Sequence, residues 1–196
     1  MRFKPEGHVI FFATSNIHKF NEARAVLNDY KIAVGMLRVK SLEIQQDDLE
    51  EIAKASVNDA FQKYKLPLIV EDAGLFIEKL NGFPGPYAAF VYRTIGNNGL
   101  LRLMEASENR EACFRSAIAY RSQKMKEPLC FTGEISGEII REERSSHNRS
   151  SFGFDPVFRP LHRDKVFAEM SIIEKNYCSH RAVALRKFAE WYKGFM

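Results

Sequence analysis

The strongest constraint on the fold is the stretch of residues 66–87, LPLIVEDAGLFIEKLNGFPGPY. Pro67–Val70 is a short apolar run rich in β-branched residues, which predicts a buried strand ending at Val70. Glu71 and Asp72 follow at once. A buried charge is costly unless it is paired or holds a cation, and α/β proteins place their chemistry at the carboxyl ends of strands. The two acids therefore indicate either a functional site at a sheet edge or a solvated acidic turn.

Small residues and a turn follow the acids. Ala73 and Gly74 leave the backbone open to the close approach of a ligand. Leu75–Ile77 predicts a further short strand, and Asn81–Pro86 predicts a stiff turn into the next segment. We therefore expect a ligand to meet the chain just after the acidic pair.

Composition places the chain among ordinary globular proteins. Its 196 residues fit one domain, and 45% hydrophobic with 28% charged residues is far from the disordered and membrane classes. The formal net charge of +4 is mild, and basic residues are scattered among acids. This balance weakly favours anionic small molecules, and we do not expect a nucleic-acid partner.

The cysteines and the apolar runs indicate a cytoplasmic protein. Cys113, Cys130 and Cys178 are odd in number and far apart, with no CxxC spacing, so neither a disulfide framework nor a zinc site is indicated. Val9–Ala13 is too short for the core of a signal peptide. No stretch approaches the roughly 20 apolar residues of a membrane span, and we expect no membrane partner.

The N-terminal third alternates strands and helices. His8–Ala13 predicts the first strand, Lys31–Lys40 a weaker one, and Asp47–Lys63 an amphipathic helix. Between the two strands, apolar residues recur every three or four positions and predict a helix with one buried face, formed by Ile17, Phe20, Ala23 and Leu27.

The middle of the chain changes character. A helix at Tyr87–Ile95 is interrupted at Gly96–Gly99 before a second helix at Leu100–Ala106. Successive strands then follow, and their short links predict antiparallel pairing, at residues 112–121, 128–133 and 134–140. We therefore expect one domain, residues 1–196, with a β-rich lobe at about 110–160.

The last quarter predicts two helices after a polar segment. Residues 141–151 are polar and are expected to form a mobile loop, followed by a strand at Val157–Phe158. Ser171 and Glu174 have the spacing of a capping box, and Ser179 is placed to cap a final helix at residues 180–192.

A polar loop near the N-terminus is a candidate phosphate site. Thr14, Ser15 and Asn16 lie between a predicted strand and a helix start, where unpaired N–H groups and the positive end of the helix dipole attract phosphate. Lys19 adds a full charge one turn later. Simple capping of the helix is the alternative interpretation, and the GxxxxGK[ST] pattern of a Walker loop is absent from the sequence.

Two acids from separate segments are candidate metal ligands. Glu43 precedes the second predicted helix and could join Asp72 around a divalent cation. Mg²⁺ prefers hard oxygen ligands, and a polyphosphate would supply the rest. Alone, Glu43 is more typical of an ordinary surface charge.

The C-terminal quarter offers parts suited to a nucleotide base. Aromatic faces, a flexible glycine and a carboxylate acceptor lie within four residues, Phe152, Gly153, Phe154 and Asp155. The alternative is a turn whose phenylalanines fill the core. Near the start of the last helix, against the dipole preference, positive charge gathers at Lys175, His180 and Arg181. Cations there suit an anion, although a structural imidazole is the alternative for His180.

Together these segments resemble the inosine triphosphate pyrophosphatase family, whose members are also described as XTP/dITP diphosphatases. The resemblance covers nearly the whole chain. It rests on motifs that occur here in the family's order, namely ATSNIHKFNEA, LEIQ, VEDAGLFIEKLNGFPGPY, SFGFDPVF, FAEM and EKNYCSHR.

The resemblance implies an elongated α/β fold with a mixed sheet, two lobes and the active cleft between them, commonly as a homodimer. It implies Mg²⁺-dependent hydrolysis of deaminated purine nucleoside triphosphates (ITP, dITP, XTP) to the monophosphate and pyrophosphate, which removes them from the nucleotide pool. A house-cleaning hydrolase of other base preference is a related alternative. A nucleotide- or nucleic-acid-binding module without catalysis is an alternative of another class.

The resemblance also implies roles by position. Asp72 would be the general base and, with Glu43, a metal ligand, and Ala73 would lie beside the substrate. The phosphates would be held by Thr14, Ser15, Asn16, Ile17, His18 and Lys19. The base would be received by Phe152, Gly153, Phe154 and Asp155, with Lys175, His180 and Arg181 completing the pocket.

Arg181 is the expected donor for base selectivity. Hypoxanthine and xanthine carry a keto oxygen at C6, where adenine carries an amino group. If the pocket offers N–H donors at that position, the amino group of adenine faces donors and stays unpaired. A mismatched buried polar group costs roughly 1–3 kcal/mol. Guanine also carries the C6 oxygen, so its rejection must depend on the C2 side.

The chain departs from the family pattern at two basic positions. Ala89 stands where many relatives carry a basic residue, and Ser56 stands where some relatives carry a Lys. We expect Arg93, Lys54 or Lys63 to compensate for the lost phosphate-binding charge.

Overall fold

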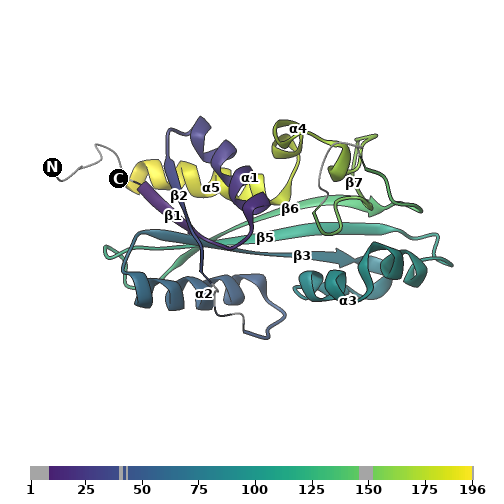
Figure 1. The fold of residues 1–196 in the computed structure, drawn as a ribbon, viewed down its shortest axis with the longest axis horizontal. Helices are drawn as coiled ribbons and strands as arrows, with labels where there is room; N and C mark the ends of the chain where they lie inside the picture. The colour runs from purple at the N-terminus through teal and green to yellow at the C-terminus, as the bar shows by residue number, and fades with distance from the viewer. Residues whose placement is uncertain (1–8, 40–41, 43, 146–151, 196) are drawn as a thin grey trace.

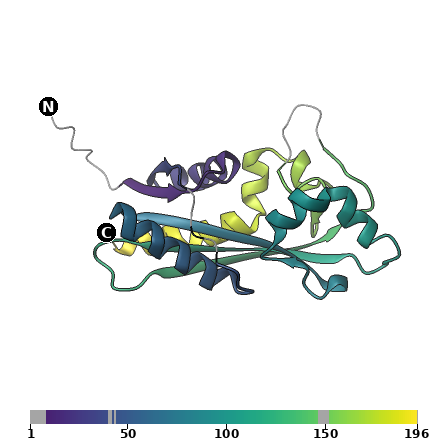
Figure 2. The same ribbon diagram turned by 60° about the horizontal axis from the view of Figure 1, so that its bottom comes forward.

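The fold is built on a mixed β-sheet, with helices packed on its faces (Figures 1 and 2). The computed structural model describes residues 9–39, 42, 44–145 and 152–195. Within them the sheet has seven strands in the order β2-β1-β3-β5-β6-β7, with β4 paired to β3 outside this path. The pairs β1–β2 and β1–β3 are parallel, and the others are antiparallel. The predicted mixed-sheet α/β fold is confirmed.

The first half of the chain contains, in order, β1 (Val9–Ala13), α1 (Ile17–Asp29), β2 (Ala33–Leu37), α2 (Leu49–Tyr64), β3 (Leu68–Ile77), a 3₁₀ turn (Glu78–Leu80), β4 (Pro84–Gly85) and α3 (Ala88–Leu103). The second half contains β5 (Glu111–Arg121), β6 (Leu129–Ile139), β7 (Phe158–Pro160), a 3₁₀ turn (Phe167–Glu169), α4 (Ile172–Tyr177) and α5 (His180–Phe195). The predicted break in the middle helix appears as a kink in α3 at Gly96, where φ is 63°.

Two predicted strand boundaries are wrong. β3 does not end at Val70 but continues through both acids to Ile77, so Leu75–Ile77 is not a separate strand. Residues 128–133 and 134–140 are likewise parts of one strand, β6. Long antiparallel pairing of β3 with β5, and of β5 with β6, carries each strand past the polar residues that suggested an end.

The central strand β3 has an open edge in its middle. On that side β1 pairs with Leu68 and Ile69, and β4 pairs with Leu75 and Phe76, so no described strand covers residues 70–74 between them. The carbonyl of Glu71 instead accepts a hydrogen bond from Lys19 Nζ at 3.5 Å. Because alternate peptide groups of a strand point to the same side, those of Glu71 and Ala73 face this opening.

Gly74 serves the fold rather than a ligand. A Cβ at this position would lie 2.6 Å from the carbonyl oxygen of Gly85, so β4 crosses β3 where a side chain would stand. Ala73 lines a cavity described below, whereas Gly74 does not. The expectation that both residues admit a ligand is therefore wrong for Gly74.

Two clusters of buried side chains fix the helices on the sheet. One joins β1, β3 and β5 to α1 and α5, through residues that include Phe12, Ile69 and Leu185. The other packs α2 against Leu68 and Val70. Since neighbouring residues of a strand point to opposite faces, α1 and α5 cover one face and α2 the other, as Figure 1 shows.

The predicted helix signals at both ends of the chain are largely confirmed. On α1 the residues Phe20, Ala23 and Leu27 are buried, but Ile17 is 44% exposed and does not belong to the apolar face. Ser171 forms the predicted capping box with Glu174 at the start of α4. Ser179 Oγ accepts the backbone N–H of Ala182 in α5 at 3.2 Å. The expected loop at residues 141–151 lies partly outside the described residues.

Candidate functional site

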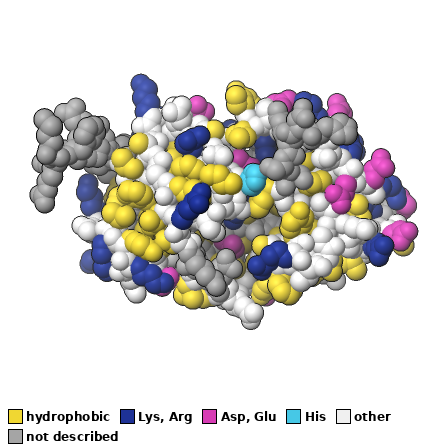
Figure 3. Space-filling model, in the orientation of Figure 1, with side chains coloured by type: hydrophobic (Ala, Val, Ile, Leu, Met, Phe, Trp, Pro, Cys, Tyr) yellow, Lys and Arg dark blue, Asp and Glu magenta, His cyan; other side chains and the backbone are white. Residues whose placement is uncertain are grey.

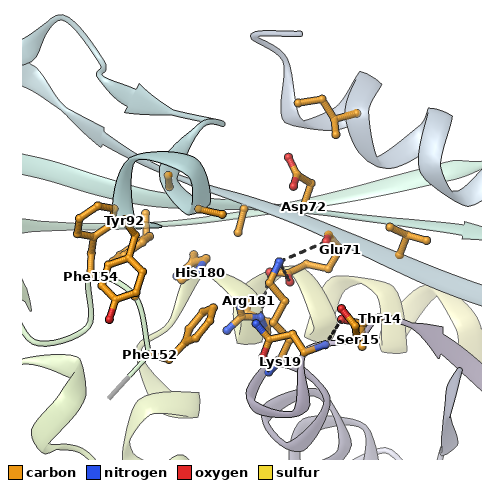
Figure 4. Close-up of a pocket in the computed structure, with 18 of the residues that line it drawn as sticks. Thr14, Ser15, Lys19, Glu71, Asp72, Tyr92, Phe152, Phe154, His180 and Arg181 are labelled. Carbon is orange, nitrogen blue, oxygen red and sulfur yellow. Dashed lines mark hydrogen bonds and ion pairs between the residues drawn. The ribbon is translucent and has the colours of Figure 1, made fainter. Parts of the chain in front are cut away.

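A cavity of about 460 Å³ opens at the uncovered edge of β3 (Figure 4). Its wall includes the polar loop after β1, the centre of β3, the first half of α3, and residues from α4 and α5. Of the predicted site residues it brings together Thr14, Ser15, Asn16, Lys19, Asp72, Ala73, Phe152, Gly153, Phe154, Asp155, Lys175, His180 and Arg181. Residues more than 150 positions apart thus share one cavity.

Three predicted residues are not part of the described wall. Ile17 and His18 lie in the first turn of α1 but do not line the cavity. The ring of His18 stacks on Phe152, with centroids 5.7 Å apart. Glu43 lies outside the described residues, so its predicted partnership with Asp72 stays a prediction.

The polar loop after β1 presents the start of α1 to the cavity. Asn16 is the N-cap, and its side-chain oxygen accepts the backbone N–H groups of His18 at 3.0 Å and Lys19 at 3.2 Å. Thr14 Oγ1 accepts the N–H of Asn16 at 3.1 Å. Capping therefore does occur here, and it holds Ser15 and the positive end of the helix dipole at the cavity wall.

Glu71 is a buried anion that positions two cations. Its carboxylate accepts hydrogen bonds from Ser116 Oγ and from Arg181 Nε, each at 2.9 Å, and forms an ion pair with Lys19 at 3.0 Å. Burial alone would raise the pKa of Glu71, but the charges of Arg181 and Lys19 outweigh it and hold the pKa well below its usual range. The carboxylate is therefore ionised, with Oε1 hydrogen-bonded to Ser116 and Arg181 and Oε2 in an ion pair with Lys19.

Glu22 of α1 joins the same network from the other side. It forms ion pairs with Lys175 Nζ at 2.9 Å and with Arg181 Nη1, and Lys175 also pairs with Asp155 at 2.6 Å. Burial raises the pKa of Glu22, but the charges of Arg181 and Lys175 lower it by more, so the pKa falls to about 2. Three acids and three bases thus form a network of balanced charge, and every member except Glu22 lines the cavity. Removing one partner of such a buried pair is costly.

His180 is neutral and fixed by packing. Its ring is 3% exposed and stacks on Phe114, with centroids 4.7 Å apart and planes 12° apart. A Cβ on Gly133 would lie 2.1 Å from the His180 carbonyl oxygen, so α5 begins in direct contact with the backbone of β6. Burial lowers the pKa of His180 well below its usual value. The predicted positive cluster is therefore wrong for His180, which contributes an aromatic surface and not a charge.

Asp72 points to the opposite face of β3 from Glu71 and is half-buried in the cavity wall. Figure 4 shows its carboxylate on one side of β3, with Arg181 and Lys19 on the other side of the strand near Glu71. Among the described residues no group of three or more His, Cys, Asp or Glu side chains is arranged to hold a metal ion. Asp72 is thus a carboxylate of the described wall on the face of β3 opposite to Glu71.

The FGFD segment divides between core and cavity. Phe154 is 3% exposed and packs in the core as well as lining the cavity, with Tyr92 edge-on at 5.6 Å. Phe152 is half-buried, and Gly153 adopts φ 56° between the two rings. Phe152 is therefore the more accessible aromatic face, while Phe154 agrees with the core-filling alternative as well as with the site.

Ala89 and Ser56, where the resemblance leads us to expect basic residues, both lie in the cavity wall. Ala89 is exposed there, and buried Ser56 donates a hydrogen bond to the carbonyl of Leu42. Of the three residues expected to compensate, only Arg93 lines the cavity. Lys54 and Lys63 instead form ion pairs with acids of their own helix. Charges elsewhere are dispersed, as the face drawn in Figure 3 shows.

Sequence reasoning missed Glu22, Tyr92 and Ser116. Tyr92 lines the cavity, whereas Glu22 and Ser116 hold the residues that do. The one available signal is that Glu22 lies beside Ala23 on the buried side of a helix, where an acid requires a partner. Nothing local in the sequence marks Tyr92 or Ser116.

Comparisons with known proteins give matches to both sequences and solved structures. A model of the Ham1 family matches residues 10–191. A Methanopyrus kandleri protein named dITP/XTP pyrophosphatase is 48% identical over 94% of this chain and 96% of its own length. One of the same name from Thermococcus kodakarensis is 45% identical over 93% and 96%. The structure of the Staphylococcus aureus Ham1 protein superposes with a TM-score of 0.79 at 26% identity, covering 96% of this chain and 100% of that one. The chain belongs to the Ham1 family.

Proposed function

We propose that this protein hydrolyses deaminated purine nucleoside triphosphates, ITP, dITP and XTP, to the monophosphate and pyrophosphate. The relatives named dITP/XTP pyrophosphatase support the substrate class. The observation that carries the proposal is the single cavity at the open edge of β3. It combines a carboxylate (Asp72), a helix start suited to phosphate (Thr14–Asn16) and an aromatic face (Phe152).

In this mechanism Asp72 is the general base. Its carboxylate orients a water molecule and accepts its proton while the water oxygen attacks the α-phosphorus. The bond from that phosphorus to the oxygen bridging to the β-phosphate breaks, and pyrophosphate leaves with the electron pair. Ser15 and the α1 dipole face the phosphates, and Lys19, held by Glu71 at 3.0 Å, lies 18% exposed beside them.

We propose Mg²⁺ as the cofactor. Asp72 offers a hard oxygen ligand, and Mg²⁺ takes most of its other ligands from water and substrate phosphates, so the donors in the wall fit it. Glu71 fits less well, because Oε1 already accepts hydrogen bonds from Ser116 and Arg181 and Oε2 is ion-paired with Lys19. When bound, the ion would neutralise charge on the phosphate oxygens.

Base recognition is proposed for the polar groups behind Phe152. Arg181 commits Nε to Glu71 and Nη1 to Glu22, so its other N–H groups are held in a fixed orientation at the cavity. We propose that they donate to the C6 keto oxygen of hypoxanthine or xanthine. Adenine would present an amino group to these donors and lose roughly 1–3 kcal/mol for each mismatch.

The test compares turnover of ITP, XTP, dITP, GTP, ATP and dUTP with Mg²⁺ and identifies the phosphorus products. IMP with pyrophosphate supports cleavage at the α-phosphorus, whereas IDP with orthophosphate refutes it. Asp72→Asn should abolish turnover while retaining ITP binding. Binding of ITP by the wild type without any hydrolysis, with Mg²⁺ or Mn²⁺, would identify a binding module instead.

We also propose a homodimer in a reducing cytoplasm. Large apolar side chains are exposed close together in sequence, around the turn of β4 and the start of α3, at Phe83 (41%), Tyr87 (41%) and Phe90 (59%). The three cysteines are free, which suits reducing conditions. No helix among the described residues is long and apolar enough to cross a membrane. Light scattering of the wild type and of Phe90→Glu tests the dimer, since the variant should be monomeric.

A further inference from the structure

The cations of the cavity differ in whether they have an anionic partner. Four basic residues line it, and three of them belong to the neutral buried network, because Lys19, Lys175 and Arg181 all pair with acids within 3.0 Å. Arg93 takes part in no ion pair or hydrogen bond among the described residues. It is therefore the uncommitted cation of the described wall.

The position of Arg93 suits an incoming anion. It lies on α3 one helical turn after Ala89, and both side chains are exposed and line the cavity. The first turn of α3 has no side-chain cap, so its amide groups add positive potential at the same wall. A guanidinium presents a rigid fork of N–H donors that matches phosphate oxygens in pairs.

We propose that Arg93 binds the phosphate chain of the substrate. The inference rests on the proposed hydrolysis of nucleoside triphosphates and names a residue for it. A triphosphate brings several negative charges into the cavity. The acids and bases of the buried network already neutralise one another, so the attraction must come from a cation outside that network. Arg93 supplies it from α3, whose first turns line the cavity.

The first experiment is Arg93→Ala with Arg102→Ala as its matched control. Arg102 is an exposed arginine on the same helix that lies outside the cavity wall. Arg93→Ala should raise the KM for ITP about tenfold, with kcat changed less than threefold, whereas Arg102→Ala should leave both unchanged. The effect should shrink between about 0.05 and 0.5 M salt, since exposed charges are screened. An unchanged KM, or an effect independent of salt, would overturn the inference.

A second variant tests position on the helix. Because Ala89 and Arg93 share one face, Ala89→Lys combined with Arg93→Ala should restore most of the lost KM. The shared-face argument is refuted if the folded double variant shows no rescue while Arg93→Lys recovers the KM fully. That result would place the anion beyond the reach of residue 89.

Binding measurements separate this inference from the proposed activity. Inorganic tripolyphosphate should bind Arg93→Ala about tenfold more weakly than the wild type in calorimetry, while inosine should bind both equally. The opposite pattern would assign Arg93 to the base and overturn the inference. Absence of hydrolysis by the wild type would refute the proposed function and leave the tripolyphosphate result still decisive for Arg93.

Discussion

Replacement of Glu71 by glutamine gives the sharpest test of the buried network. The Glu71 side chain is 0% exposed and pairs with Lys19 and with Arg181, which is itself 3% exposed. Glu71→Gln preserves shape but removes the negative charge and turns an amide donor toward donors. The neutral network of three acids and three bases would then hold one uncompensated positive charge.

The magnitude follows from burial. Removing one partner of a buried ion pair costs about 3–5 kcal/mol. Arg181 retains Glu22 and the glutamine retains one acceptor, so we expect the lower end, about 3 kcal/mol. For a chain of this length 1 kcal/mol shifts Tm by about 2–4 °C, which predicts a fall of about 6–12 °C.

Urea denaturation and thermal melting measure this cost, with Glu134→Gln as the control. Glu134 pairs with Arg115 at 2.7 Å, but the two side chains are 49% and 48% exposed. Exposed pairs contribute below about 1 kcal/mol, so the control should lose no more than that. If the two variants lost equal stability, the claim that Glu71 anchors a buried charge network would be wrong.

Three further outcomes follow from the structure. The pKa of Glu22 is about 2 in the fold, against an ordinary 4.5, so its ionised form stabilises the fold above pH 4.5. The free energy of unfolding should therefore fall as the pH drops from 4.5 to about 2. A pH series of urea melts should show a shallower fall for Glu22→Gln. Gly133→Ala would place a methyl group 2.1 Å from the carbonyl oxygen of His180 and should lower the free energy of unfolding by about 1–3 kcal/mol. Gly194→Ala is the control, because nothing lies within 4 Å of that position and stability should not change. Phe152→Ala should raise the KM for ITP about tenfold, as expected for one lost base stack, with Tm unchanged; an unchanged KM would exclude Phe152 from base binding.

Much of the fold could be predicted because its signals are local. The helices α1, α2 and α5 have buried faces repeated every three or four residues and begin after polar capping residues, Asn16, Asp48 and Ser179. The length of β3 could not be predicted in this way. Its acids resemble a strand end because buried acids are rare, and the cations that make them tolerable lie far away in sequence. Lys19 is 52 residues from Glu71, and Arg181 is 110 residues from it.

The candidate site shows the same division between local and distant information. Thr14–Asn16 and the FGFD segment carry recognisable local chemistry, and the structure brings both to one cavity. The burial of Lys175, by contrast, could not be predicted, because its partner Glu22 lies 153 residues away in the sequence. The departures at Ala89 and Ser56 were visible in the sequence. Only the structure separates Arg93 from Lys54 and Lys63 as the residue that lines the cavity.

The open edge of β3 means that part of the cavity wall is main chain. The peptide groups of Glu71 and Ala73 point into the opening, as the contact from Lys19 to the Glu71 carbonyl illustrates. Such donors and acceptors persist whatever side chain the position carries, so alanine scanning cannot reveal them. Their contribution would be exposed only by chemistry that alters the polypeptide itself, such as an ester in place of one amide.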